Sequence, residues 1–122
     1  MQVEEIGKEQ AKLLEIVWKN EPIGSGNLVK KCNDELGWKK STTYTVLRVL
    51  CKKGLLLNQD STITALVSRD KYYFDKSVHF MDDAYNGSLP AFISAFSSAR
   101  KLTPEEINAL QQIIDEYRKG DD

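Results

Sequence analysis

The sequence predicts a mainly α-helical protein that contains one small β-hairpin. Through most of the 122 residues, apolar side chains recur every three or four positions, which is the spacing of one buried stripe on an α-helix. Residues 55–67 differ, because two runs rich in leucine or β-branched residues flank a polar cluster, as in two strands joined by a turn. An apolar fraction of 41% is ordinary for a globular chain that can bury a core.

The first two expected helices lie before residue 37. Residues 8–20 place one apolar face along the helix, formed by Leu13, Leu14, Val17 and Trp18. Residues 24–27 read as a turn in which Ser25 or Asn27 caps the next helix. That second helix has its own stripe, formed by Leu28, Val29, Cys32 and Leu36, and Gly37 ends it.

A third helix is expected within residues 37–54 and ends at Gly54. Its apolar stripe consists of Val46, Leu47, Leu50 and Cys51, and its other side carries Lys40, Ser41, Thr42, Tyr44, Thr45, Arg48 and Lys52. Five bases and no acid fall between residues 39 and 53. Such a face suits a DNA major groove, where arginine and lysine reach phosphates or guanine and hydroxyls reach phosphates or thymine. A solvated basic face is the alternative that these residues alone leave open.

Three short helices separated by tight turns, the third of them basic, are typical of a helix-turn-helix unit. The hairpin follows directly, with strands at 55–57 and 62–67 and a turn at 58–61. A hairpin in this place is the wing of a winged helix-turn-helix domain. This wing is poor in charge, although its loop could lie along the phosphate backbone.

Helical patterns return after the hairpin. An aromatic-rich stretch from Tyr72 ends at the turn Asn86-Gly87, and a second helix begins near Ser88 and Pro90 with the stripe Leu89, Phe92, Ile93 and Phe96. Thr103-Pro104-Glu105-Glu106 is a capping box that starts the last helix. The stripe of that helix is Ile107, Leu110, Ile113, Ile114 and Tyr117, and residues 120–122 are expected to fray.

This pattern divides the chain into a winged-helix DNA-binding domain at 1–70 and a helical dimerisation region at 71–122. The stripes of the second part could fold back on the first or pack against a second copy. We favour the second copy, because a twofold dimer doubles the contacts on a palindromic site. The residues expected at the dimer interface are Phe80, Tyr85, Leu89, Phe92, Ile93, Phe96, Ile107, Leu110 and Ile114.

The sequence offers no case for an enzyme, a cofactor or a metal. It has neither a Gly-rich phosphate loop nor a nucleophile elbow, and His79, the only histidine, has no companion at a metal-ligand spacing. Cys32 and Cys51 are expected to be buried free thiols. The net charge of −1 divides into 11 bases against 9 acids in residues 1–70 and 6 against 9 in residues 71–122, so the basic cluster lies in the mildly basic part.

A cytoplasmic protein that does not insert into membranes is expected. No apolar run approaches the roughly 20 residues that cross a bilayer. The acidic start Met-Gln-Val-Glu-Glu-Ile has no signal-peptide pattern.

Over about residues 8–118 the chain resembles the BlaI/MecI family of penicillinase and methicillin-resistance repressors, which includes the copper-responsive CopY branch. The similar segments are Glu15-Ile16-Val17-Trp18, Trp38-Lys39-Lys40-Ser41-Thr42-Thr43-Tyr44-Thr45-Val46-Leu47, Lys53-Gly54-Leu55-Leu56, Ala65-Leu66-Val67-Ser68 and the stretch from Asn86-Gly87-Ser88 to Phe96. The second of these is similar to the family's "W..sTvyTvL" helix.

The resemblance implies a dimeric repressor on a short inverted repeat in a promoter. In the antibiotic branch, a membrane sensor protease cuts the repressor in its dimerisation region, and the matching bond here is Ala95–Phe96, where alanine replaces the usual asparagine. Packing in the dimer core is the alternative role of Phe96. Copper sensing is not expected, because no cysteine follows Cys51. The wing is shorter than is usual in the family and has Ile63 and Thr64 where an aromatic residue stands in the exit strand.

Two alternatives of other classes remain open at this point. A winged helix can serve as a protein-interaction module, in which case the basic face binds an acidic partner without preference for any DNA sequence. A small-molecule-sensing regulator would instead have a ligand pocket lined by Tyr72, Tyr73, Phe80 and Phe92.

Overall fold

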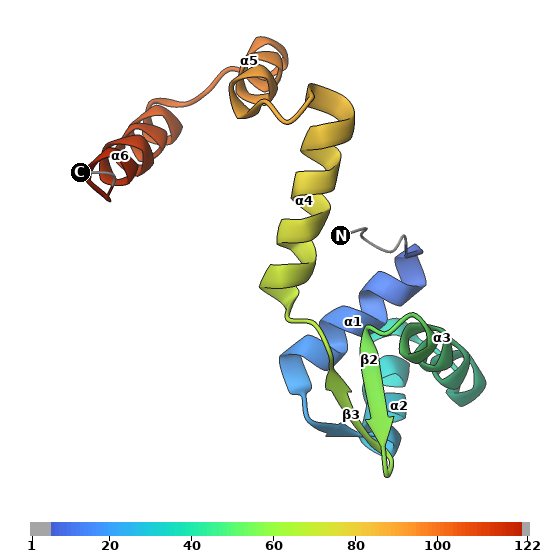
Figure 1. The fold of residues 1–122 in the computed structure, drawn as a ribbon. Coiled ribbons are helices and arrows are strands. Elements are labelled where there is room, and N and C mark those ends of the chain that lie inside the picture. Colours follow the sequence, from blue (N-terminus) through green and yellow to red (C-terminus); the bar gives the residue numbers. More distant parts are fainter. Residues whose placement is uncertain (1–5, 121–122) are drawn as a thin grey trace. The chain divides into compact units, whose positions relative to one another are not determined.

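The structure is a computed structural model that describes residues 6–120. The acidic start of the chain and the last two residues of the expected frayed end therefore lie outside the described residues. The elements follow the order α1 (Lys8–Asn20), β1 (Ile23–Gly24), α2 (Ser25–Leu36), α3 (Lys40–Lys52), β2 (Leu56–Gln59), β3 (Thr62–Ala65), α4 (Arg69–Tyr85), α5 (Leu89–Ala99) and α6 (Pro104–Gly120) (Figure 1). The expected class, mainly α with a small β-hairpin, is confirmed.

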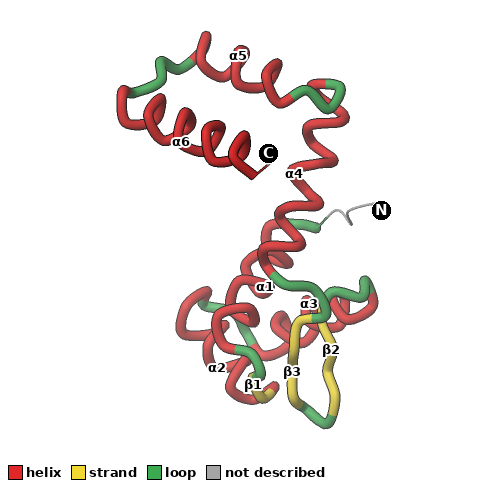
Figure 2. Tube along the Cα trace, turned by 60° about the vertical axis from the view of Figure 1, so that its left-hand side comes forward, coloured by secondary structure: helices red, strands yellow, loops and turns green. Residues whose placement is uncertain are grey.

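The chain forms two compact units, Met1–His79 and Phe80–Asp122. The first unit is a winged helix: α1, α2 and α3 pack around one apolar core, and a three-stranded antiparallel sheet with the order β1-β3-β2 completes it (Figure 2). All the buried apolar residues of the described chain belong to this core, and the last of them in sequence is Tyr72. The units meet inside α4, beyond residue 70, because the first turns of α4 still pack on the core.

The wing is a hairpin with a two-residue turn. Gln59 pairs with Thr62, and Asp60 and Ser61 both have positive φ, as a type I′ turn requires. The expected hairpin is confirmed, but the turn is shorter than expected because the polar residues Asn58 and Gln59 belong to β2. Polar side chains are compatible with a strand here, since both are exposed.

Strand β1 was not predicted, and it changes how α2 begins. Ile23 is buried and pairs with Ile63 of the central strand. Helix α2 starts at Ser25 with Gly24 as its N-cap, and no side chain caps it. The predicted cap by Ser25 or Asn27 is therefore wrong. The Ser25 amide instead donates to the Ser61 carbonyl of the wing turn at 2.8 Å, which occupies one of the amides that a cap would serve.

The second unit consists of the end of α4 with α5 and α6. Both predicted helix starts are confirmed: the Ala91 amide donates to Ser88 Oγ at 3.1 Å, and Thr103 and Glu106 form a reciprocal capping box with bonds of 2.9 and 3.1 Å. No residue of α5 or α6 is buried in the described chain. The unit therefore carries well-formed helices whose apolar stripes remain open.

Candidate nucleic-acid interface

The third helix, α3, presents one face to the core and the opposite face to solvent. Its buried residues are Thr43, Leu47 and Leu50, at 0%, 3% and 0% exposure. All four residues of the predicted stripe contact the core, but Val46 and Cys51 are only half-buried. The innermost residue at the start of the helix is Thr43, which the predicted stripe did not include. The spacing of 43, 47 and 50 is itself that of a helical stripe, so the position of Thr43 was recoverable from the sequence.

Thr43 fills this place because its polar group is satisfied. Its hydroxyl donates to the carbonyl of Lys39, the residue just before α3, at 3.4 Å, and it also bonds the Cys32 thiol of α2. Burial raises the pKa of Cys32, and the bond with Thr43 offsets part of that rise. Cys32 thus stays a neutral packing residue, and the prediction of a buried free thiol is confirmed for it.

The turn between α2 and α3 fixes the start of the basic helix. Gly37 has φ +69°, and its amide donates to the Asn33 carbonyl at 3.0 Å, which closes the end of α2. The Asn33 side-chain amide then bridges the turn by donating to the Trp38 carbonyl at 3.1 Å. Trp38 itself packs on the core. These contacts seat the first turn of α3 against α2.

Six of the seven side chains predicted to meet DNA are exposed on α3: Lys40, Ser41, Thr42, Thr45, Arg48 and Lys52. Tyr44 is half-buried, packs on the core, and lies under the Lys40 ammonium, which is 6.0 Å from its ring centroid. The Thr45 hydroxyl donates to the Ser41 carbonyl at 2.9 Å, so its methyl group and its free lone pairs are what it offers to a partner.

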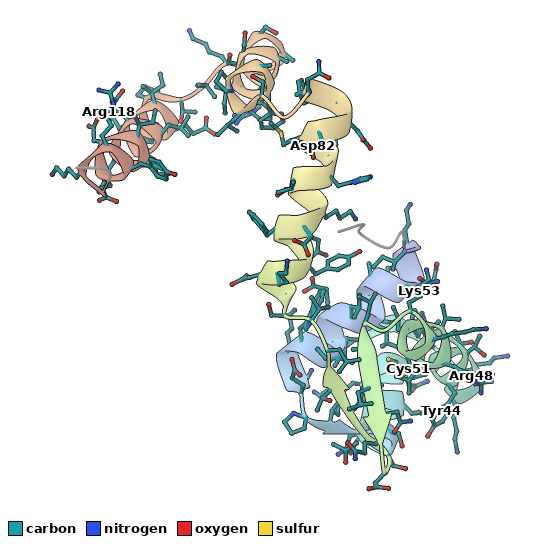
Figure 3. The ribbon with its side chains drawn as sticks, viewed as in Figure 1. Tyr44, Arg48, Cys51, Lys53, Asp82 and Arg118 are labelled. Carbon is teal, nitrogen blue, oxygen red and sulfur yellow. The ribbon has the colours of Figure 1, made fainter. Side chains whose placement is uncertain are left out.

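A shallow hollow of about 250 Å³ lies along this face, lined by Tyr44, Leu47, Arg48, Cys51 and Asn58. Tyr44, Arg48 and Cys51 follow one another along α3 in Figure 3. Burial raises the pKa of the Cys51 thiol, and the Asn58 backbone lowers it to a lesser degree. Cys51 is a free thiol but only half-buried, which corrects the prediction that both thiols are buried.

Positive charge in this region is concentrated on α3. Among the five bases of residues 39–53, Lys53 is directed toward α1, where its ammonium donates to Gln10 Oε1 at 3.0 Å. The wing adds no cation, because residues 55–68 contain neither lysine nor arginine, and its exposed turn carries Asp60. The geometry can therefore engage an anionic partner through one helix, with little help from the wing.

The residues predicted for dimerisation gather in the second unit. The rings of Phe80, Tyr85 and Phe92 meet edge to face, with centroids 5.4 to 6.4 Å apart, and Phe96 continues the row at 5.9 Å from Phe92. Leu89, Ile107 and Ile114 are about half exposed or more. A hollow of about 400 Å³ between α5 and α6 is lined by Phe92, Ile93, Phe96, Arg100, Leu102, Glu106, Ala109 and Leu110.

The four aromatic residues of the small-molecule alternative are divided between the two units. Tyr72 and Tyr73 pack against Trp18 of α1, whereas Phe80 and Phe92 belong to the row in the second unit. Tyr72 is only 4% exposed, so it offers no surface to a ligand. The possible cleavage bond, Ala95–Phe96, lies inside α5 with both residues exposed.

The described residues hold no group of three or more His, Cys, Asp or Glu side chains placed to bind a metal ion. Within the same residues, every helix is too short or too polar to cross a bilayer.

A winged helix whose third helix exposes basic and hydroxyl side chains defines a class of regulatory proteins. The sequence profile described as penicillinase repressor matches residues 6–116, and this chain belongs to that family. The penicillinase repressor of Bacillus licheniformis is 28% identical over 120 residues, which cover 95% of this chain and 94% of the relative. The methicillin resistance regulatory proteins MecI of Mammaliicoccus sciuri and Staphylococcus epidermidis are each 23% identical over 114 residues, which cover 90% of this chain and 93% of the relative. The names of these relatives are those of a repressor and of regulatory proteins.

Proposed function

We propose that this chain is a transcriptional repressor that binds an inverted-repeat operator as a homodimer, with α3 of each copy in a major groove. The observation that carries the proposal is the exposed face of α3. Lys40, Arg48 and Lys52 share it with three hydroxyl residues, and no acid interrupts it between residues 39 and 53. An arginine in the middle of such a helix can reach guanine, while lysines nearer its ends can neutralise phosphates.

The weakly charged wing makes the proposed contact depend on α3. A single helix reads few base pairs, and a monomer with one basic helix holds few phosphates. Two copies on one inverted repeat would double both kinds of contact. The names of the relatives, repressor and regulatory protein, agree with this use of the fold.

The second unit supports the dimeric part of the proposal. Its helices α5 and α6 contain no buried residue. Large apolar side chains on them are about half exposed or more: 61% for Leu89, 51% for Ile107, 62% for Ile113 and 49% for Ile114. A unit of about 40 residues rarely has a sufficient core of its own. A second copy of the same stripes would remove this apolar surface from water and make a twofold interface.

We propose that repression is relieved by loss of this interface. A cut at Ala95–Phe96 would separate α6 and the row residue Phe96 from the rest of the chain, and release of DNA would follow from the lost tether. The family resemblance makes a membrane sensor protease the candidate partner for this cut.

Selection from random DNA tests the central proposal. The purified full chain is mixed with random fragments, and the bound fragments are sequenced. We expect an inverted repeat, and sedimentation of the complex should give two chains per site. Binding without any sequence preference would instead favour the protein-interaction module, in which the basic face of α3 serves an acidic partner.

A further inference from the structure

Helix α1 and the first turns of α4 are joined by five side chains, which we name the clasp: Glu15, Trp18, Arg69, Tyr72 and Tyr73. All five lie in the first unit, and none has a place in the proposed DNA contact. Glu15 and Trp18 are one turn apart on α1, so together they reach two successive turns of α4.

The polar side of the clasp centres on the Glu15 carboxylate. The Arg69 guanidinium donates through Nε to both of its oxygens, at 3.0 and 3.2 Å, and the Tyr73 hydroxyl approaches Oε1 at 3.4 Å. Arg69 also lies over the Tyr73 ring, 4.8 Å from its centroid. Burial raises the pKa of Tyr73 and the Glu15 charge raises it further, so the phenol remains a donor. One carboxylate therefore holds the first and fifth residues of α4.

The aromatic side of the clasp consists of the buried Tyr72 and the half-buried Trp18 and Tyr73. Trp18 Nε1 donates to the Val67 carbonyl, just before α4, at 2.9 Å. Its ring lies 5.7 Å from Tyr72 and 6.0 Å from Tyr73, and these two tyrosines meet edge to face at 5.2 Å. Residues on two sides of α4 are thus fixed to α1, which restrains both the tilt of α4 and its rotation about its own axis.

We propose that the clasp sets the direction in which α4 leaves the winged helix, and thereby the separation of half-sites that the dimer accepts. This inference rests on the proposed function. An inverted repeat is bound by two recognition helices only when its half-sites lie at the separation that the protein imposes. In this chain α4 is the element that runs from the first unit into the second, so its direction enters that separation.

A small tilt of α4 would be enough to change this separation by more than one base pair. Helix α4 has 17 residues and is therefore about 25 Å long. A tilt of about 10° at its base would move its far end by about 4 Å, which exceeds the 3.4 Å rise per base pair. A single contact would still allow such a tilt, whereas contacts at two turns and on two sides of α4 resist it.

The test compares full-length proteins on operators of different spacing. The double variant E15Q/Y73F removes the Glu15 charge and the Tyr73 hydroxyl and keeps the three aromatic rings. R69Q is a second variant, which removes the guanidinium that bonds Glu15. The control is K71Q/D75N, which removes an exposed ion pair of 2.8 Å on α4 that does not reach α1. Each protein is titrated with the selected operator, with operators lengthened or shortened by one and two base pairs, and with a single half-site.

We expect the parent and the control to lose affinity at least tenfold when the spacer changes by one base pair. E15Q/Y73F and R69Q should lose less than threefold, while their affinity for a single half-site stays within twofold of the parent. A clasp variant that folds and keeps the full spacer penalty would overturn the proposal. A parent that selects no inverted repeat would remove the proposed function and this inference together, whereas unchanged spacing in the variants would remove only the inference.

Discussion

Replacement of Tyr72 by alanine should destabilise the first unit by about 3–5 kcal/mol, the usual cost of removing a buried aromatic side chain. Tyr72 is only 4% exposed and contacts Trp18 and Tyr73. A tyrosine buries about 200 Å², which at 25 cal/mol per Å² gives about 5 kcal/mol as an upper value. That cost is a large part of the roughly 5–15 kcal/mol by which a domain is stable.

Phe74→Ala is the matched control. Phe74 is two residues further along α4 but is 62% exposed, so its loss should change stability by at most about 0.5 kcal/mol. Urea unfolding is followed by tryptophan fluorescence, because both tryptophans, Trp18 and Trp38, lie in the first unit and report on it alone. Equal midpoints for the two variants would refute the assignment of the start of α4 to the core of the winged helix.

Three further predictions concern binding, assembly and pH. Arg48→Ala should weaken operator binding by about 1–3 kcal/mol if the arginine holds a base, whereas Lys52→Ala should weaken binding to all DNA and flatten its salt dependence. Titrations at several salt concentrations distinguish these two effects. Unchanged affinity in both variants would contradict the placement of α3 in the groove. A chain that ends at His79 should sediment as a folded monomer and lose orders of magnitude in operator affinity, and a dimeric fragment would contradict the role of the second unit. The Arg100 guanidinium, together with the Thr103 amide, lowers the pKa of Glu106 from 4.5 to about 2. The stabilisation that this carboxylate gives to α6 should therefore be present above about pH 4.5 and disappear toward pH 2. Circular dichroism of the parent measures this pH dependence, which the Glu106→Gln variant should lack.

The sequence by itself determined the elements whose information is local. Helix α1 runs from Lys8 to Asn20 as its period predicted, and the box at Thr103 starts α6 because its two hydrogen bonds join residues three apart. The basic face of α3 was equally readable, since a helix of known period places Lys40, Arg48 and Lys52 without reference to the rest of the fold. Exposure of these side chains follows once Leu47 and Leu50 face the core.

Only the tertiary structure decided features that depend on distant partners. Strand β1 has two residues, too few to show a period, and exists because Ile23 pairs with Ile63 across 40 positions of sequence. The start of α2 is satisfied by Ser61 of the wing and not by a neighbouring side chain.

The division of roles among the adjacent aromatics at the start of α4 has the same origin. Tyr72, Tyr73 and Phe74 look alike as a sequence, yet the first is buried, the second contacts Glu15 and the third is exposed. Helical period separates their directions by about 100° each, but only the position of α1 decides which direction meets a partner. Trp18 and Glu15, more than 50 residues away, make that choice, because burial and hydrogen bonding are gained only where the partner lies.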